Sequence, residues 1–350
     1  MIGIVAEFNP FHSGHSFLIS EAKKYFGQSE PVVAVLSGDF AQRGEPAIRD
    51  KFYRAESAIN GGCDLVIELP VQWSLSSAEG FARGAIGILN SIGCDNLAFG
   101  SESGSLNEIK LFSDEIDSIK EYLKIHPDLT FPKARREVTG NKLLDGPNNL
   151  LAIEYLKFSN KMNLFTAKRT NEHDGLYSAK SIRAGMLKPD LEVPIISRLK
   201  MFDKEYFNSL PDSDNGAGNR LYNAVYNNNS LDAICSEAQS KNFTLSRIRR
   251  MTMCAAIGIK KGDNTGIPPY ARILGFNEIG RSLLANLKKS SLIPIITLPK
   301  QINSYDKKLY NVFATGASAR ELYSLGINKI QPYFQSNDFI INPVIVNNAQ

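Results

Sequence analysis

Residues 2–15 read IGIVAEFNPFHSGH, a short apolar run followed by a proline-containing loop and the pattern HxGH. An apolar run of this length, closed by polar residues, is typical of a strand that is buried on both faces. The HxGH pattern follows the loop directly and is predicted to open a helix. The first strand, loop and helix therefore indicate an α/β fold, with a candidate site in the loop between them.

Further runs of the same kind alternate with helical segments along the chain. The predicted strands lie at 31–37, 64–69, 95–100 and 162–166. Apolar residues at three- and four-residue intervals predict helices at 16–24, 50–59, 77–92 and 106–124, with later helices from about 147 and over 181–187. This order predicts a doubly wound parallel sheet with right-handed crossovers, whose ligands bind beyond the carboxyl ends of the strands.

The chain has 350 residues, which is more than one compact core usually organises. The sequence Lys188-Pro189-Asp190 interrupts the α/β pattern, and most of the chain beyond it has helical periodicity. The polar stretch 211–219 has too few apolar residues to be core and is predicted to be a loop. We therefore expect a doubly wound domain over 1–188 and a mostly helical domain over 189–350.

The composition excludes several classes of protein. Hydrophobic residues make up 43% and charged residues 22%, which is typical of a folded globular chain. No apolar run reaches the roughly eighteen residues that a membrane span needs, and the N-terminus lacks the basic segment of a signal peptide. The four cysteines lie far apart, so neither a zinc site nor a disulfide framework is predicted. We expect a cytoplasmic protein with reduced cysteines, no membrane contact and no dedicated metal site.

His12 and His15 are spaced for phosphate chemistry. Three residues apart on a first helical turn, their rings lie on one face, beside unpaired backbone N–H groups and the positive end of the helix dipole. Gly14 would let a ribose or a flat ring approach the helix backbone closely. Each imidazole would stabilise the charge on a departing pyrophosphate by about 3 kcal/mol, as oxyanion-hole donors do. The alternative is that His12 caps the helix and His15 only packs.

A second polar cluster, at 177–183, reads YSAKSIR at the start of another predicted helix. Two hydroxyls, Ser178 and Ser181, would form an anion clamp together with Lys180 and Arg183. The alternative is that these serines only cap the helix. Paired with HxGH, the segment predicts a site that grips a triphosphate.

This pairing of HxGH with an SSTxxR-like segment resembles the HIGH-type nucleotidyltransferase superfamily, whose members bind ATP and attack its α-phosphate. A longer series of strings makes the resemblance more specific. AEFNPFHSGH, LSGDFAQRGEPAI, DLVIELP, FGSE, GPNNLLAIEYLK and SAKSIR occur in this order and look like the bacterial tRNA(Met) cytidine acetate ligases. The similarity runs through most of residues 1–188, and residues 216–221, 246–253 and 270–276 resemble later segments of that family more loosely.

The resemblance implies an ATP-dependent acetate ligase. In that family ATP and acetate form acetyl-adenylate and pyrophosphate, and the acetyl group passes to the exocyclic amine of the wobble cytidine in elongator tRNA(Met). It implies a Rossmann-like catalytic domain over 1–188 and a tRNA-binding domain over 189–350. ATP is then a substrate, acetate and tRNA are the partners, and Mg²⁺ is expected to be held mainly by the ATP phosphates.

The candidate site combines the positions that match the family's ATP site with the two clusters described above. We expect catalytic roles for His12, His15 and Arg183. The predicted ATP-binding residues are Val5, Ala6, Glu7, Phe8, Asn9, Pro10, Phe11, His12, Ser13, Gly14, His15, Ser16, Phe17, Leu18, Gly100, Asn148, Asn149, Arg169, Ser178, Lys180, Ser181 and Arg183. The alternatives are a turn for Gly100, a helix cap for Asn149 and a surface ion pair for Arg169.

Residues 37–46 follow the second predicted strand and are predicted to form a long loop that covers the site. An acyl-adenylate is a mixed anhydride that water destroys, so the intermediate must stay enclosed until the amine arrives. The alternative for Asp39 and Arg43 in this loop is an exposed ion pair without a role.

Residues 238–262 contain no acidic residue but several cations. The predicted tRNA-binding residues are Lys241, Arg247, Arg249, Arg250, Lys260 and Lys261. Tyr270 and Arg272 follow and would place an aromatic ring near cations, an arrangement that suits single-stranded RNA loops. If all six cations neutralise phosphates, log K should fall with log[salt] with a slope of about −4 to −5. The alternative is a solvated helix face.

Two other functions fit parts of the pattern. An adenylyl- or cytidylyltransferase that acts on a small metabolite would explain the ATP motif and leave the basic region unused. A non-catalytic tRNA-binding protein would explain the basic region, but the intact pattern His12, Gly14, His15 and Arg183 argues against a decayed site.

Overall fold

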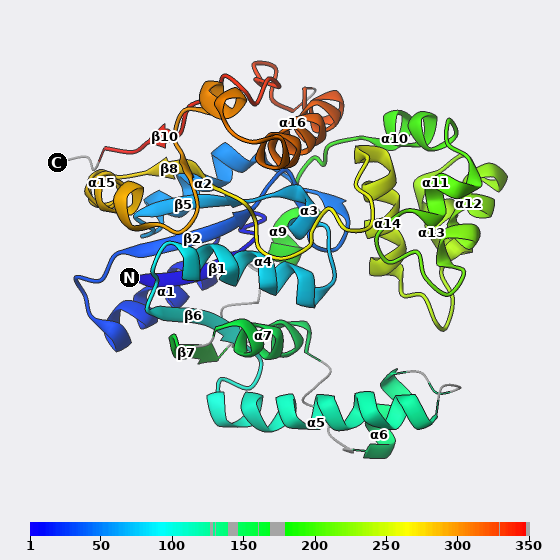
Figure 1. Cartoon of the computed structure of the whole chain (residues 1–350), viewed down its shortest axis with the longest axis horizontal. Coiled ribbons are helices and arrows are strands. Elements are labelled where there is room, and N and C mark those ends of the chain that lie inside the picture. Colours follow the sequence, from blue (N-terminus) through cyan, green and yellow to red (C-terminus); the bar gives the residue numbers. More distant parts are fainter. Residues whose placement is uncertain are drawn as a thin grey trace.

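The computed structural model describes residues 1–126, 129, 131–138, 146–159, 161–168, 179–328 and 330–347. An eight-stranded sheet lies at its centre, with strand order β10-β8-β5-β2-β1-β6-β7 and with β9 paired to β8 (Figure 1). The strands are β1 (Ile2–Ala6), β2 (Val32–Ser37), β5 (Leu65–Leu69), β6 (Asn96–Ser101), β7 (Asn163–Lys168), β8 (Ala271–Phe276), β9 (Ile295–Ile296) and β10 (Val344–Ile345). A small separate hairpin pairs β3 (Phe40–Ala41) with β4 (Glu45–Pro46).

Helices flank the sheet on both faces and extend beyond it. Those of the first half are α1 (Ser13–Phe26), α2 (Lys51–Asn60), α3 (Val71–Ser74), α4 (Ala78–Ser91), α5 (Leu106–Ile125), α6 (Phe131–Val138) and α7 (Pro147–Phe158). Those of the second half are α9 (Ala179–Ala184), α10 (Glu192–Leu199), α11 (Lys204–Asn208), α12 (Ala217–Asn227), α13 (Leu231–Ala238), α14 (Leu245–Ile257), α15 (Glu278–Ser290), the 3₁₀ helix η2 (Pro299–Ser304) and α16 (Lys307–Ile327). In the part of the chain that the structure describes, none of these is long and apolar enough to cross a membrane.

The middle strands are apolar throughout because both faces of the sheet are covered. In β2, Val32 and Ala34 face a core shared with α1 and α2, whereas Val33 and Val35 face a second core that includes α4 and α7. Successive side chains of a strand alternate between faces, so an uninterrupted apolar run fills both cores. The pairs β1–β2, β2–β5, β1–β6 and β6–β7 are all parallel, as the alternation of strands and helices predicted.

The structure differs from the expected division of the chain at residue 189. Strand β8 lies in the central sheet, antiparallel to β5, with Phe276 opposite Leu65. The antiparallel β5–β8 pair makes the sheet mixed. β9 and β10 both pair with β8 in parallel, so the last part of the chain belongs to the sheet. The apolar run of β8 carries no local sign of its partner, because the two strands lie more than two hundred residues apart in the sequence.

The helical part of the second half is concentrated in α10–α14, which Figure 1 shows gathered at one side of the sheet. These helices bury a third apolar core of their own. Helix α16 joins it to the sheet, because Phe313 packs in the core of the sheet whereas Tyr323 and Ile327 pack in the helical core. The predicted covering loop also contributes, since Phe40 of β3 is buried in the helical core.

Candidate functional site

The two histidines of HxGH form a reciprocal cap at the start of α1. The Gly14 N–H donates to His12 Nδ1 over 3.1 Å, and the His12 N–H donates to His15 Nδ1 over 3.2 Å. The two ring centroids are 3.8 Å apart. The capping alternative is therefore correct for His12, and it does not exclude the functional interpretation. Because each Nδ1 accepts a hydrogen bond, the neutral rings carry their proton on Nε2 and act there as donors.

Aromatic packing fixes the orientation of these rings. The Phe8 ring is buried and lies 4.8 Å from His15 in an edge-on arrangement, and the Phe11 ring lies 5.4 Å from His15. Phe8 has a positive φ of 42°, a conformation that bulky side chains rarely adopt and that is often found at functional sites. The backbone turn between β1 and α1 thus places its side chains in one defined geometry.

Arg183 reaches this loop from a distant part of the sequence. Its Nη1 donates to the Asn9 carbonyl over 2.5 Å, and the Asn9 side chain accepts the Ile48 N–H over 2.8 Å. The structure thus places Arg183, the last residue of SAKSIR, against the loop that precedes HxGH. Arg169 and Ser178 lie outside the described residues. Ser181 is exposed on α9, and only the helical backbone of Lys180 is described.

A buried arginine that the sequence reasoning missed connects the strand ends. Arg54 of α2 donates to the carbonyls of Glu7, Arg49, Ser37 and Gly38, and so ties the end of β1 to the end of β2. Burial lowers the pKa of its guanidinium, and Asp39 is the strongest of the nearby charges that oppose this shift. The sequence offered one indication of this role: Arg54 stands at a position of the helical pattern that faces the core, where an apolar residue is expected.

The predicted covering loop is the β3–β4 hairpin, and Glu7 holds it over the end of β1. The Gln42 N–H donates to Glu7 Oε1 over 2.6 Å, and the Gln42 amide donates to the Ser76 carbonyl over 3.0 Å. Asp39 is buried and pairs with Arg320 at 3.0 Å, whereas Arg43 is exposed. The alternative of an exposed Asp39–Arg43 pair is therefore wrong.

Glu102 organises the loop at the end of β6, the strand that contains Gly100. Its carboxylate accepts the backbone N–H groups of Asn148 and Asn149 and so caps α7. The Asn149 side chain is buried, and its Oδ1 accepts the N–H groups of Glu102 and Ser103. Asn149 does not cap the helix; it fixes the loop that leaves β6.

The predicted RNA-binding cations are largely engaged with neighbouring groups. Arg249 pairs with Glu45 of the β3–β4 hairpin, Arg250 pairs with Asp212 at 3.1 Å, and Lys261 pairs with Asp214 at 2.7 Å. Arg247 donates to the backbone carbonyl of Asp212 at 2.6 and 2.9 Å. Lys241 and Lys260 are exposed.

Tyr270 and Arg272 do not belong to such a surface, because both are buried. Arg272 pairs with Asp338 at 2.5 Å and with Glu68, the residue opposite it on β5, at 3.1 Å. The prediction of an exposed aromatic beside cations at these positions is therefore wrong. Tyr270 directly precedes β8 and Arg272 lies in it, and this strand is buried on both faces.

The four cysteines are free, and all four are buried. Burial raises the pKa of Cys94 to about 12 and also raises those of Cys63, Cys235 and Cys254, so none is a reactive thiolate. Within the described ranges, no group of three or more His, Cys, Asp or Glu side chains could hold a metal ion.

Comparison with known proteins agrees with this geometry. The model of the HIGH Nucleotidyl Transferase family matches residues 1–193 and 185–338. The tRNA(Met) cytidine acetate ligase of Clostridium acetobutylicum is 34% identical and covers 95% of this chain and 98% of its own length. That of Clostridium tetani is 35% identical, with 98% and 99% covered. The chain belongs to the tRNA(Met) cytidine acetate ligase family.

Solved structures of this ligase family have the same fold over their whole length. The chain aligns with Thermotoga maritima TmcAL bound with alpha-thio ATP at a TM-score of 0.86 and 27% identity, with 99% of each chain covered. The ligand-free form of the same protein gives a TM-score of 0.87 at 26% identity. The second segment that the family model matches, residues 185–338, includes β8 and the whole of α16.

Proposed function

We propose that this chain activates acetate with ATP and transfers the acetyl group to the exocyclic amine of the wobble cytidine in elongator tRNA(Met), giving N4-acetylcytidine. The observation that carries the proposal is the reciprocal cap of His12 and His15. It presents two Nε2 donors at the start of α1, beside Arg183, in a chain of the acetate ligase family.

In the first step, a carboxylate oxygen of acetate attacks the α-phosphorus of ATP. The bond from that phosphorus to the bridging oxygen breaks, and pyrophosphate leaves with the electron pair. The Nε2–H groups of His12 and His15, the Arg183 guanidinium and the positive end of α1 stabilise the charge that develops on the phosphate oxygens. Magnesium would enter with ATP, held mainly by the phosphate oxygens, and would neutralise phosphate charge.

In the second step, the N4 amine of cytidine attacks the acetyl carbonyl carbon, AMP leaves with the electron pair, and the amine loses a proton. The mixed anhydride must be kept from water between the two steps. The β3–β4 hairpin lies at the end of β1, held by Glu7 and by Arg249, and serves as the cover. Because ATP and tRNA are the substrates, we place the reaction in the cytoplasm.

For RNA contact we propose the surface of Lys241, Arg247, Arg249, Arg250, Lys260 and Lys261 in the helical part of the chain. The packing of this surface against the covering hairpin supports the assignment, since Gly44 of the hairpin lies against the backbone of Arg249 and Arg250. A tRNA bound there would lie beside the adenylate site. We therefore propose that the part built around the sheet binds ATP and that the helices α10–α14 bind tRNA.

The test is incubation of the enzyme with ATP, labelled acetate and unfractionated tRNA, followed by nucleoside analysis, with pyrophosphate exchange into ATP measured alongside. Label in N4-acetylcytidine and exchange stimulated by acetate are expected. Exchange stimulated only by another small acid would support the metabolite nucleotidyltransferase instead. Tight tRNA binding without exchange for any acid would support the non-catalytic RNA-binding protein.

A further inference from the structure

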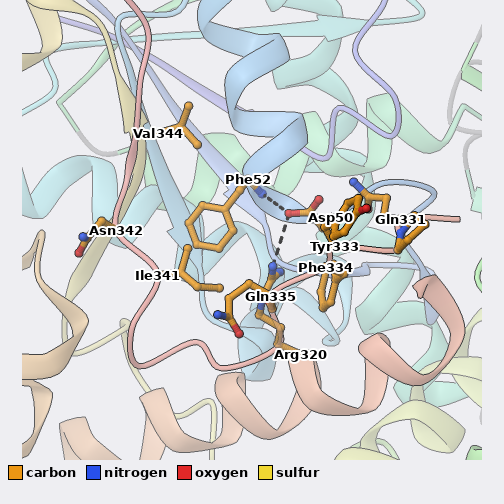
Figure 2. A pocket seen from close by; sticks show the side chains of 11 residues that line it. Asp50, Phe52, Arg320, Gln331, Tyr333, Phe334, Gln335, Ile341, Asn342 and Val344 are labelled. Carbon is orange, nitrogen blue, oxygen red and sulfur yellow. Dashed lines mark hydrogen bonds and ion pairs between the residues drawn. The ribbon is translucent and has the colours of Figure 1, made fainter. Parts of the chain in front are cut away.

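A pocket of about 420 Å³ opens where the segment after α16 crosses the start of α2 (Figure 2). Phe52 and the Asp50–Arg320 pair come from α2, its cap and α16, and the remaining wall comes from residues 331–344. Its volume is in the range of sites for small organic ligands. No residue of the β1–α1 loop or of the β3–β4 hairpin lines it, so its occupant does not touch the adenylate site.

The floor of the pocket is formed by aromatic rings and by a guanidinium whose charge is neutralised by carboxylates. The Arg320 guanidinium lies 5.0 Å from the Phe52 ring centroid and 4.2 Å from the Phe334 ring centroid, while Asp39 pairs with it at 3.0 Å. Asp50 lies 3.7 Å from the same group. Because this cation is already neutralised and held in place, the floor suits a neutral planar ring better than a phosphate.

The mouth of the pocket combines a stacking surface with amide groups. Tyr333 and Gln335 are exposed on one side of it, and Asn342 is exposed on the opposite side (Figure 2). An amide carries both a donor and an acceptor, which matches the mixed edge of a nucleobase. Exposed aromatic rings next to such groups are how proteins hold unstacked bases of single-stranded RNA loops.

Contacts around the pocket connect it to the proposed active site. Asp50 lies two residues from Ile48, whose N–H binds the Asn9 side chain in the β1–α1 loop. Tyr323 of α16 donates to the Ala47 carbonyl over 2.8 Å in the same segment. A ligand in the pocket is thus anchored to the framework that holds the ATP loop.

We propose that this pocket holds an unpaired base of the tRNA anticodon loop, other than the cytidine that is acetylated. The proposal rests on the proposed function, because it requires that RNA is the second substrate. Tyr333 stacks on the base, and Gln335 binds its edge. Holding a neighbouring base fixes the register of the loop, so that only one cytidine reaches the acetyl group.

Tyr333→Ala tests the proposal in a direct binding measurement with an anticodon stem–loop RNA. Loss of one base stack should weaken the affinity by about tenfold or more, and Tyr333→Phe or Tyr333→Trp should retain it. The matched control is Tyr305→Ala, which removes another exposed tyrosine that does not line the pocket and should leave affinity unchanged. Thermal unfolding of each variant checks that the fold is intact.

The outcomes separate this proposal from the proposed function. If the unmodified enzyme binds the stem–loop and Tyr333→Ala binds it equally well, the pocket assignment is wrong and the ligase function stands. If the unmodified enzyme binds no RNA, the proposed function itself is wrong. A fluorescent base analogue placed at each loop position in turn should be quenched at one position only, and Tyr333→Ala should abolish that quenching.

Discussion

At the scale of single residues, His12 serves two roles through two different nitrogen atoms. Its Nδ1 caps α1 by accepting the Gly14 N–H, and the proposed chemistry uses the Nε2–H on the other side of the ring. The capping role accounts for helix stability and the second role for catalysis, so a suitable replacement separates them. Asparagine is among the best N-cap residues and has no imidazole.

We predict that His12→Asn keeps the thermal midpoint within a few degrees and lowers acetate-stimulated pyrophosphate exchange by about a hundredfold or more. His12→Ala loses the cap as well, at a cost of about 1 kcal/mol in the free energy of unfolding. Exchange assays and thermal unfolding on the same samples measure the two effects. Normal exchange in His12→Asn would remove this ring from the mechanism.

At the scale of secondary structure elements, the β3–β4 hairpin fits tightly against α14. Gly44 has φ of +76°, and a Cβ atom built on it would lie 2.4 Å from the Arg250 backbone nitrogen. Gly262 has a similar φ of +92° but has open space around it. The two glycines therefore share the backbone strain of a substitution, and only Gly44 adds a collision with a helix.

We predict that Gly262→Ala costs about 1 kcal/mol of unfolding free energy through strain alone, whereas Gly44→Ala costs clearly more. Urea unfolding of both variants measures the difference. Because the displaced hairpin would leave the anhydride open to water, Gly44→Ala should also release AMP from ATP and acetate without RNA. Equal stability of the two variants would mean that the hairpin does not pack on α14 as described.

The strands of the sheet differ in how well the sequence predicts them. Apolar runs sufficed for β1, β2, β5 and β6, because these strands are buried on both faces and bounded by turn residues. Strand β8 was assigned to a helical domain, since its antiparallel pairing with β5 is non-local. Motif spacing brought HxGH and Arg183 together, and Glu102 is the last residue of the FGSE string. Arg54 lies outside all of these strings, because it acts through backbone carbonyl groups.

At the scale of the whole molecule, a buried ionic cluster fastens the end of the chain to the sheet. Asp338 lies 2.6 Å from Lys51 and 2.5 Å from Arg272 of β8, which is paired with Glu68 of β5. Burial alone would raise the pKa of Asp338, but Arg272 and Lys51 outweigh it and hold that pKa well below its ordinary value. A carboxyl group with a depressed folded-state pKa stabilises the fold above its unfolded pKa of about 4.

We predict that the free energy of unfolding is steady above about pH 5 and decreases as the pH falls below about 4, since protons then bind the unfolded Asp338 more readily. Asp338→Asn leaves the buried cations Lys51 and Arg272 to share the carboxylate of Glu68 and should cost about 3–5 kcal/mol at pH 7. Urea midpoints measured between pH 3 and pH 7 test both statements. A fully stable Asp338→Asn protein would show that the cluster does not fasten the chain end.

The charge distribution of the whole molecule changes the expected salt dependence of tRNA binding. Of the six proposed cations, Arg249, Arg250 and Lys261 have carboxylate partners, whereas Lys241, Arg247 and Lys260 have none among the described residues. A paired cation that keeps its carboxylate brings little net charge to the RNA and releases few counterions. Each unpaired cation that meets a phosphate contributes about 0.7–0.9 to the slope.

We therefore predict that log K for tRNA falls with log[salt] with a slope of about −2 to −3, rather than the −4 to −5 expected if all six cations meet phosphates. Lys241→Gln should reduce the magnitude of the slope by just under one, and Lys288→Gln on α15, an exposed cation outside this surface, should leave it unchanged. Filter binding across a salt series measures these slopes. A slope of −4 to −5 would show that tRNA displaces the carboxylates, including Glu45 of the hairpin, and binding would then loosen the cover of the site as RNA arrives.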